Sequence, residues 1–157
     1  MSRDFVHENE ASRRELSELI QGLRERDLER DAGAGWTVST LLCHLAFWDL
    51  RVLYLVKEWQ RSGMEPTVRP GPQAVDSINE AVKTISRAVP GRLAAQMALE
   101  SAAAVDSELE LLSGEWIDRI SSAGLERALR RSLHRREHLR KIEKAARVFP
   151  DPDRCID

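Results

Sequence analysis

The sequence predicts an all-α protein in which four long helices and one extra short helix form a bundle. Apolar residues recur at three- and four-residue spacings in five segments, which glycines and prolines separate. No segment shows the alternation of a half-buried strand, and no internal repeat is visible. A chain of 157 residues has a single-domain length. We therefore expect one domain over residues 1–149 and a loose tail over residues 150–157, where two prolines prevent a helix from continuing.

The first half of the chain contains two of the predicted long helices. Residues 3–26 carry apolar side chains at helical spacing with charged residues between them. Residues 31–35 contain two glycines that break this period and predict a turn. The second helix begins after Thr37, a residue type that caps helix N-termini, and extends to about Ser62. Because this helix is apolar on almost every side, we expect other helices to cover it on several sides.

The second half of the chain predicts a long connection, a short helix and two further long helices. Residues 63–72 hold three prolines and two glycines and predict an irregular connection. Residues 73–89 have one apolar stripe and predict the short extra helix. Residues 91–112 predict the third long helix, and residues 115–124 a connector that closes one end of the core. Residues 125–147 contain no Gly or Pro and predict the last helix.

Composition and charge exclude several functional classes. The net charge is −2, so no overall basic field attracts the chain to nucleic acid. Basic residues do gather in the last predicted helix, but acidic residues of the preceding helix offset them. The most apolar run, residues 38–56, contains His44, Asp49 and Arg51, which argues against a membrane span. No secretory signal or disulfide framework is recognisable, and we expect a cytoplasmic protein.

Three of the four histidines are candidates for a metal site. His134 and His138 are four residues apart, so in a helix they lie on one face, about one turn apart. Two imidazoles on one face can hold a metal ion, but many such pairs are simply hydrated side chains on a charged helix. His44 lies in the most apolar predicted helix, where a buried imidazole needs a partner. The three side chains meet if these two helices are neighbours in the bundle.

Several neighbouring residues have two interpretations each. Arg127 and Arg131 project near the face of His134, where they either receive an anionic group of a ligand or pair with surface carboxylates. Trp48 lies one turn beyond His44 and forms either a cleft wall or part of the core.

Glu137 also has more than one interpretation. It is either a partner of the histidines or a hydrated side chain. Residues 134–138 match the H-x-x-E-H pattern of inverted zinc proteases. That motif needs a further acidic ligand well downstream, and only nineteen residues follow His138. The pattern therefore gives little support to a protease.

Two motifs resemble signatures of the DinB/YfiT-like metalloprotein family. The stretch Gly35-Trp36-Thr37-Val38-Ser39-Thr40-Leu41-Leu42-Cys43-His44-Leu45-Ala46-Phe47-Trp48-Asp49 is similar to the second-helix signature, a Trp-Ser/Thr-Val opening followed by a His-Leu pair. The pattern His134-x-x-Glu137-His138-x-x-x-Ile142 is similar to the last-helix signature. The order of the motifs, the gap of about ninety residues and the chain length fit as well. The resemblance therefore covers nearly the whole chain.

This resemblance implies a fold, a cofactor and a range of functions. The fold is an up-down-down-up antiparallel four-helix bundle, and the cofactor is a divalent metal, zinc or nickel, held by His44, His134 and His138 with open coordination positions. Relatives include mycothiol-dependent maleylpyruvate isomerase and transferases that use mycothiol or bacillithiol. We therefore expect a metal-dependent thiol S-transferase or hydrolase for a small-molecule substrate. The alternative is a non-catalytic metal-binding or interaction protein. Dimers are frequent in the family, and its fold is not a DNA-binding module.

Overall fold

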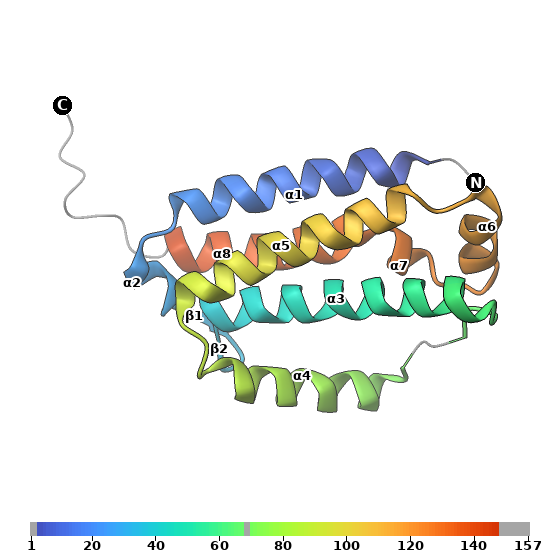
Figure 1. Cartoon of the computed structure of the whole chain (residues 1–157). Helices are drawn as coiled ribbons and strands as arrows, with labels where there is room; N and C mark the ends of the chain where they lie inside the picture. Colours follow the sequence, from blue (N-terminus) through green and yellow to red (C-terminus); the bar gives the residue numbers. More distant parts are fainter. Residues whose placement is uncertain (1–2, 68–69, 148–157) are drawn as a thin grey trace.

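The computed structural model describes residues 3–67 and 70–147, and these are mostly helical (Figure 1). The four long helices are α1 (Asp4–Gly22), α3 (Val38–Ser62), α5 (Gly91–Glu110) and α8 (Arg131–Arg147). Shorter helices are α2 (Glu25–Leu28), α4 (Pro72–Ser86), α6 (Gly114–Ser122) and α7 (Glu126–Leu129). Two short strands, β1 (Asp31–Gly33) and β2 (Trp36–Thr37), complete the described part. The predicted tail, residues 150–157, lies outside the described residues, and the domain boundary stays a prediction.

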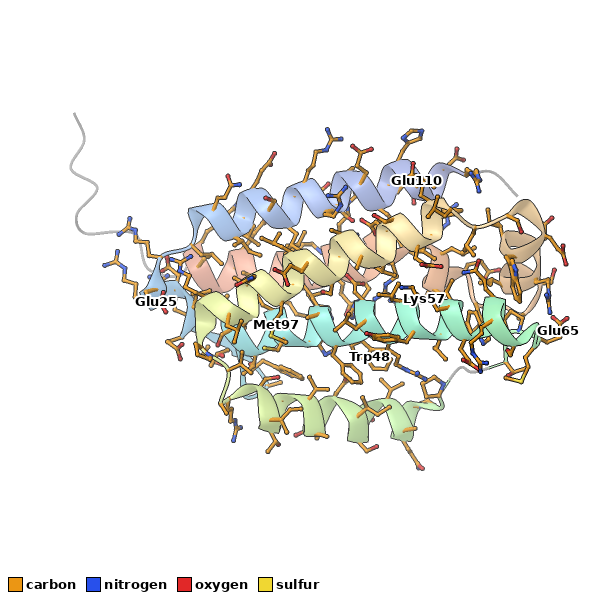
Figure 2. The ribbon with its side chains drawn as sticks, viewed as in Figure 1. Glu25, Trp48, Lys57, Glu65, Met97 and Glu110 are labelled. Carbon is orange, nitrogen blue, oxygen red and sulfur yellow. The ribbon has the colours of Figure 1, made fainter. Side chains whose placement is uncertain are left out.

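Each of the four long helices packs against two others. Helix α3 contacts α5 and α8, and α1 contacts the same two helices from the opposite side (Figure 1). Helix α4 packs on the outer side of α3, where the Trp48 indole N–H donates to Asn79 Oδ1 across 3.1 Å. Figure 2 shows Trp48 on this side of α3. The side of α3 that faces α4 and α8 is therefore where a site between these helices can form.

The buried core divides into two clusters along the length of α3. One cluster joins the first half of α3 to the ends of α1, α5 and α8 near the strands, and the other joins its second half to α6 and α7. Helix α3 is long and apolar enough to cross a membrane by composition, but 67% of its most apolar window is buried inside the protein. Burial by neighbouring helices therefore accounts for its apolar character, as the sequence predicts.

The beginning of α3 lies next to the end of α8. Thr37 caps α3, as the sequence predicts, because its hydroxyl accepts from the Thr40 backbone N–H. The Val38 N–H donates to the Arg30 carbonyl, and the Arg30 guanidinium donates to the Ala146 carbonyl near the end of α8. The two helices that carry the candidate histidines therefore run in opposite directions.

The prediction that the chain contains no strand is wrong. Strands β1 and β2 pair antiparallel, with Asp31 opposite Thr37 and Gly33 opposite Trp36. Gly33, Ala34 and Gly35 all have positive φ angles, which tighten the connection between the two strands. The sequence shows the turn correctly, but strands of two and three residues are too short to produce a period.

Residues 115–124 form a helix rather than the predicted connector. The Ser113 hydroxyl accepts from the Trp116 N–H and caps α6, and Ile117 and Ile120 are buried at the end of the core. The described part therefore contains three short helices, α2, α6 and α7, in addition to the predicted extra helix, which corresponds to α4. The predicted first helix also ends earlier than residue 26, because α1 stops at Gly22.

The predicted last helix is interrupted at Arg130, between α7 and α8. Buried Asn9 of α1 donates its amide to the Leu129 carbonyl, at 2.8 Å, and accepts the Ser132 N–H, at 2.9 Å. A side chain of another helix thus provides the hydrogen bonds that an uninterrupted backbone would make for itself. No Gly or Pro marks this break, so helix propensity alone predicts a continuous helix.

Candidate metal centre

The imidazole side chains of His44, His134 and His138 converge between α3 and α8. One candidate ligand atom from each lies within 4.8 Å of the other two, and the Nε2 atoms of His44 and His134 are 3.1 Å apart. Zinc–nitrogen bonds of about 2.0–2.1 Å in a tetrahedral site place ligand nitrogens roughly 3.3 Å apart. The three side chains, called the histidine centre below, are therefore close enough to bind one divalent ion with modest adjustment.

Helical geometry explains how the three side chains meet. His134 and His138 lie on successive turns of α8, and their ring centroids are 4.7 Å apart. His44 lies in the second turn of α3, and its ring centroid is 4.5 Å from that of His138. Trp36 of β2 packs edge-on against His44 at 5.3 Å and covers the centre from the strand side. The sequence-predicted ligand set is therefore brought together by the structure.

Two buried nitrogen atoms of the histidine centre lack partners. The Nδ1 atoms of His44 and His138 have no hydrogen-bond partner among the described residues. Buried polar atoms in native proteins are nearly always paired with protein, water or an ion. The two nitrogens of an imidazole point in different directions, and His44 faces His134 through Nε2, so the fit to a bound ion rests on the convergence of the three rings. The donor set, three neutral nitrogen ligands, suits zinc or nickel better than magnesium or calcium.

Burial keeps the three imidazoles neutral, which is the form that binds metals. Loss of hydration, and after it the charges of His138 and Lys141, lower the pKa of His44 to about 3. Burial and then Lys141 lower the pKa of His138 to about 4. The pKa of His134 lies well below its usual value, first through burial and then through the nearby Arg131 guanidinium. At neutral pH, protons therefore do not compete for these nitrogens.

Arg131 sets the tautomer of His134 in this structure. Its guanidinium is 3.1 Å from His134 Nδ1, and because a guanidinium only donates, Nδ1 accepts and the hydrogen lies on Nε2. That hydrogen points toward His44 Nε2. Binding of a metal through His134 Nε2 would move the hydrogen to Nδ1 and end the bond to Arg131. Arg131 would still be held by Asp49, whose Oδ1 accepts from its Nε at 2.7 Å.

A cleft of about 910 Å³ opens beside the histidine centre. Trp48 lines this cleft, and its indole is held by Asn79. Arg127 and Glu137 also line it but are largely exposed, with their charged atoms 3.7 Å apart. Glu137 also approaches Lys141, at 3.6 Å. All four residues that the sequence places near the histidines therefore line the cleft. Arg131 is buried, and the exposed Arg127 and Glu137 lie close enough to form an ion pair.

The sequence analysis missed a network of charged residues behind the histidine centre. Asp49, Asp106, Arg131 and Arg135, called the arginine–aspartate network below, connect α3, α5 and α8. Arg135 is fully buried, and its Nε donates to Asp49 Oδ2 at 3.0 Å. The isolated Asp49 in an apolar helix is the one sequence signal for this network, since a buried carboxylate needs a partner.

These features define a helical protein with a candidate three-histidine metal centre at the edge of a cleft. A family model described as the DinB superfamily matches residues 8–149, which is most of the chain. The chain therefore belongs to the DinB superfamily, in agreement with the resemblance of its two histidine motifs. The searches of curated proteins and of solved structures found no match.

Proposed function

We propose that this protein is a metal-dependent enzyme in which the histidine centre holds a divalent zinc or nickel ion facing the cleft. The substrate is a small electrophile, and the reaction is transfer of a low-molecular-weight thiol, such as mycothiol or bacillithiol, or hydrolysis by water. The observation that carries this proposal is the convergence of three neutral imidazoles within 4.8 Å beside a cleft of about 910 Å³. Membership of the DinB superfamily supports it.

The residues around the centre have separate roles in this proposal. A divalent metal with an open coordination position lowers the pKa of a bound water or thiol. Three protein ligands leave such a position, whereas four protein ligands close the site. The cleft gives a small molecule access to this position, and Trp36 packs edge-on against His44 as part of the cleft wall. Arg131 and Lys141 line the cleft beside the histidine centre, where their N–H donors lie near the reacting groups.

The finer features implied by the family belong to the same proposal. We infer an up-down-down-up four-helix bundle from the packing of α1, α3, α5 and α8, and from the opposite directions of α3 and α8. A cytoplasmic protein that binds neither nucleic acid nor membrane fits the charge balance and the burial of α3. A homodimer is proposed from the family resemblance alone. Light scattering on the purified chain would measure the oligomeric state.

Metal analysis of untagged protein tests the first part of the proposal. We expect about one zinc or nickel ion per chain in the natural protein, and almost none in a His134→Ala, His138→Ala double variant. The control is His7→Ala, because His7 is exposed on α1 and far in sequence from the candidate ligands. Equal metal content in the natural protein and the double variant would refute a metal site at the histidine centre.

Turnover assays separate an enzyme from a non-catalytic metal-binding protein. Metal-loaded protein is mixed with a panel of electrophiles, with and without low-molecular-weight thiols, and the loss of electrophile and of free thiol is followed over time. Turnover that disappears in the His134→Ala, His138→Ala variant supports the enzyme. Bound metal that raises the unfolding temperature, without turnover of any thiol or water reaction in the panel, favours the alternative of a binding or interaction protein.

A further inference from the structure

The cleft beside the histidine centre is far larger than a metal ion and a water molecule require. Its volume is about 910 Å³, within the range of clefts that hold organic ligands. Three of the four tryptophans of the chain line it, namely Trp36, Trp48 and Trp59. Large flat apolar walls of this kind favour a ligand with a flat apolar body.

Positive charge dominates the polar lining of the cleft. The basic side chains are Arg51, Arg127, Arg131, Lys141 and Lys144, and the acidic ones are Asp31 and Glu137. Asp49 neutralises Arg131 from behind the cleft, and Glu137 is shared between Arg127 and Lys141. A cleft with more cations than carboxylates attracts anions.

Arg51 differs from the other two arginines of the cleft, Arg127 and Arg131, because no carboxylate pairs with it in residues 3–67 and 70–147. Lys144 is also without a carboxylate partner in these residues, but an ammonium group lacks the two parallel donors with which a guanidinium binds an oxyanion. Its guanidinium lies 5.8 Å from the centroid of the Trp48 ring, in cation–π range. Trp48 is in turn fixed by the Asn79 side chain of α4, at 3.1 Å. The half-buried Arg51 side chain is therefore held against the cleft wall while its hydrogen-bonding capacity stays open for a ligand.

The position of Arg51 relative to the histidine centre limits the length of such a ligand. Arg51 follows His44 by seven residues, or two helical turns, so both side chains lie on one face of α3, roughly 10 Å apart along the axis. Trp48 lies between them, with its ring centroid 6.3 Å from that of His44. The order along the cleft is therefore metal ligand, flat wall, cation.

We propose that Arg51 anchors the anionic end of a flat organic molecule whose reactive end meets the histidine centre. The ligand class is an aromatic or otherwise planar compound with a carboxylate or related oxyanion about 7–10 Å from its reactive group, as two helical turns require. Its body lies against Trp48, and Arg51 binds its oxyanion through charge-assisted hydrogen bonds. This inference rests on the proposed function for the reactive end, but the anionic end depends on Arg51 alone.

A pair of matched probes tests this proposal. The first is 4-(mercaptomethyl)benzoate, which carries a thiol for the metal, a flat ring and a carboxylate, and the second is its neutral amide. Calorimetry measures the affinity of zinc-loaded protein for each compound. We expect the acid to bind about tenfold more tightly than the amide, because a hydrogen bond between two charges is stronger than one to a neutral group. We expect salt to weaken binding of the acid more than binding of the amide.

Two arginine variants assign the effect to one side chain. In Arg51→Gln, we expect the acid and the amide to bind with similar affinity. The matched control is Arg61→Gln, since Arg61 lies on the same helix but is exposed and paired with Glu58 outside the cleft. It should keep the tenfold preference for the acid. Circular dichroism and the unfolding temperature establish that both variants are folded.

The outcomes separate this proposal from the proposed function. Removal of the metal should weaken the binding of the acid and of the amide equally, because both carry the thiol. Substitution of Arg51 should weaken the binding of the acid alone. Three results would overturn the role of Arg51. The natural protein binds the acid and the amide with equal affinity, neither probe binds at millimolar concentration, or Arg51→Gln still binds the acid more tightly than the amide. If metal analysis finds no metal in the natural protein, the proposed function is refuted. The contribution of Arg51 to binding of the acid would be unchanged by that result.

Discussion

Two buried polar clusters lie side by side in the protein, one joining α3, α5 and α8 and the other between α3 and α8, and they differ in how their polar atoms are hydrogen-bonded. In the arginine–aspartate network, Arg135 donates to both carboxylate oxygens of Asp106, at 2.8 and 2.9 Å, to Asp49 and to the Ala102 carbonyl. In the histidine centre, the Nδ1 atoms of His44 and His138 have no partner among the described residues. Among the described residues, Arg135 of the first cluster has several hydrogen-bond partners, whereas two nitrogen atoms of the second cluster have none.

This difference in hydrogen bonding indicates that the arginine–aspartate network is structural and that the histidine centre is a binding site. A buried ion pair whose hydrogen bonds are complete holds the helices in one arrangement and has no capacity left for a ligand. Three converging nitrogens without carboxylate partners are poorly satisfied on their own and gain from an added cation. Arg131 connects the two clusters, because it contacts both Asp49 and His134. Mutations in one cluster should therefore affect stability, and mutations in the other should affect binding.

The largest expected effect is that of Arg135→Ala on stability. Removing this fully buried guanidinium leaves Asp106 without its two-pronged partner and Asp49 with Arg131 alone, which costs about 3–5 kcal/mol of unfolding free energy. Chemical denaturation measures the change. The control is Arg136→Ala, because the neighbouring Arg136 pairs with Glu15 at the surface and should change stability by less than about 1 kcal/mol. Equal effects of the two substitutions would contradict a structural role for the network.

A smaller effect is expected when the pH of metal-free protein is lowered. His44 and His138 have folded-state pKa values of about 3 and about 4, below the usual value of 6.5. Between these values and pH 6.5 the unfolded chain binds more protons, so stability is full above pH 6.5 and falls as the pH drops below it. Each histidine should remove on the order of 1 kcal/mol between pH 6.5 and 5.5.

Denaturation curves at several pH values measure this slope. A His44→Gln, His138→Gln variant should show a shallower slope, because glutamine does not titrate in this range. Bound metal should delay the loss of stability to lower pH, because protons and metal compete for the same nitrogens. A slope that is unchanged in the variant would assign the pH dependence to other groups.

The fold could be predicted from the sequence where local patterns decide the structure. Thr37 caps α3, and the predicted span of α3 to about Ser62 is confirmed, because capping and an apolar surface are local signals. The break at Arg130 could not be predicted, because Asn9, more than a hundred residues away in sequence, makes the hydrogen bonds that replace those of the helix. Helix propensity depends on the residues of the helix itself and contains no information about such distant partners.

The same distinction applies to the site. Spacing predicts that His134 and His138 share a face, and the polar His44 in an apolar helix indicates a buried partner. By contrast, sequence spacing offers no means of pairing Asp49 with Arg135, or of recognising that Arg51 has no carboxylate partner in the part of the chain that the structure describes. Both facts depend on which helices are neighbours and on their relative rotation, and these follow from packing of the whole core.

The smallest effect is expected for Glu137→Gln, which removes a charge from the cleft but no buried contact. Glu137 is about half exposed and lies 3.7 Å from Arg127 and 3.6 Å from Lys141, which are long distances for ion pairs. We expect the unfolding free energy to change by less than about 0.5 kcal/mol. We also expect metal content to stay the same, because Glu137 is outside the converging ligand group. The one measurable gain should be modestly tighter binding of 4-(mercaptomethyl)benzoate at low salt, since a competing negative charge has left the cleft. Loss of metal in this variant would instead make Glu137 part of the centre and would remove the separation between the satisfied and the unsatisfied cluster.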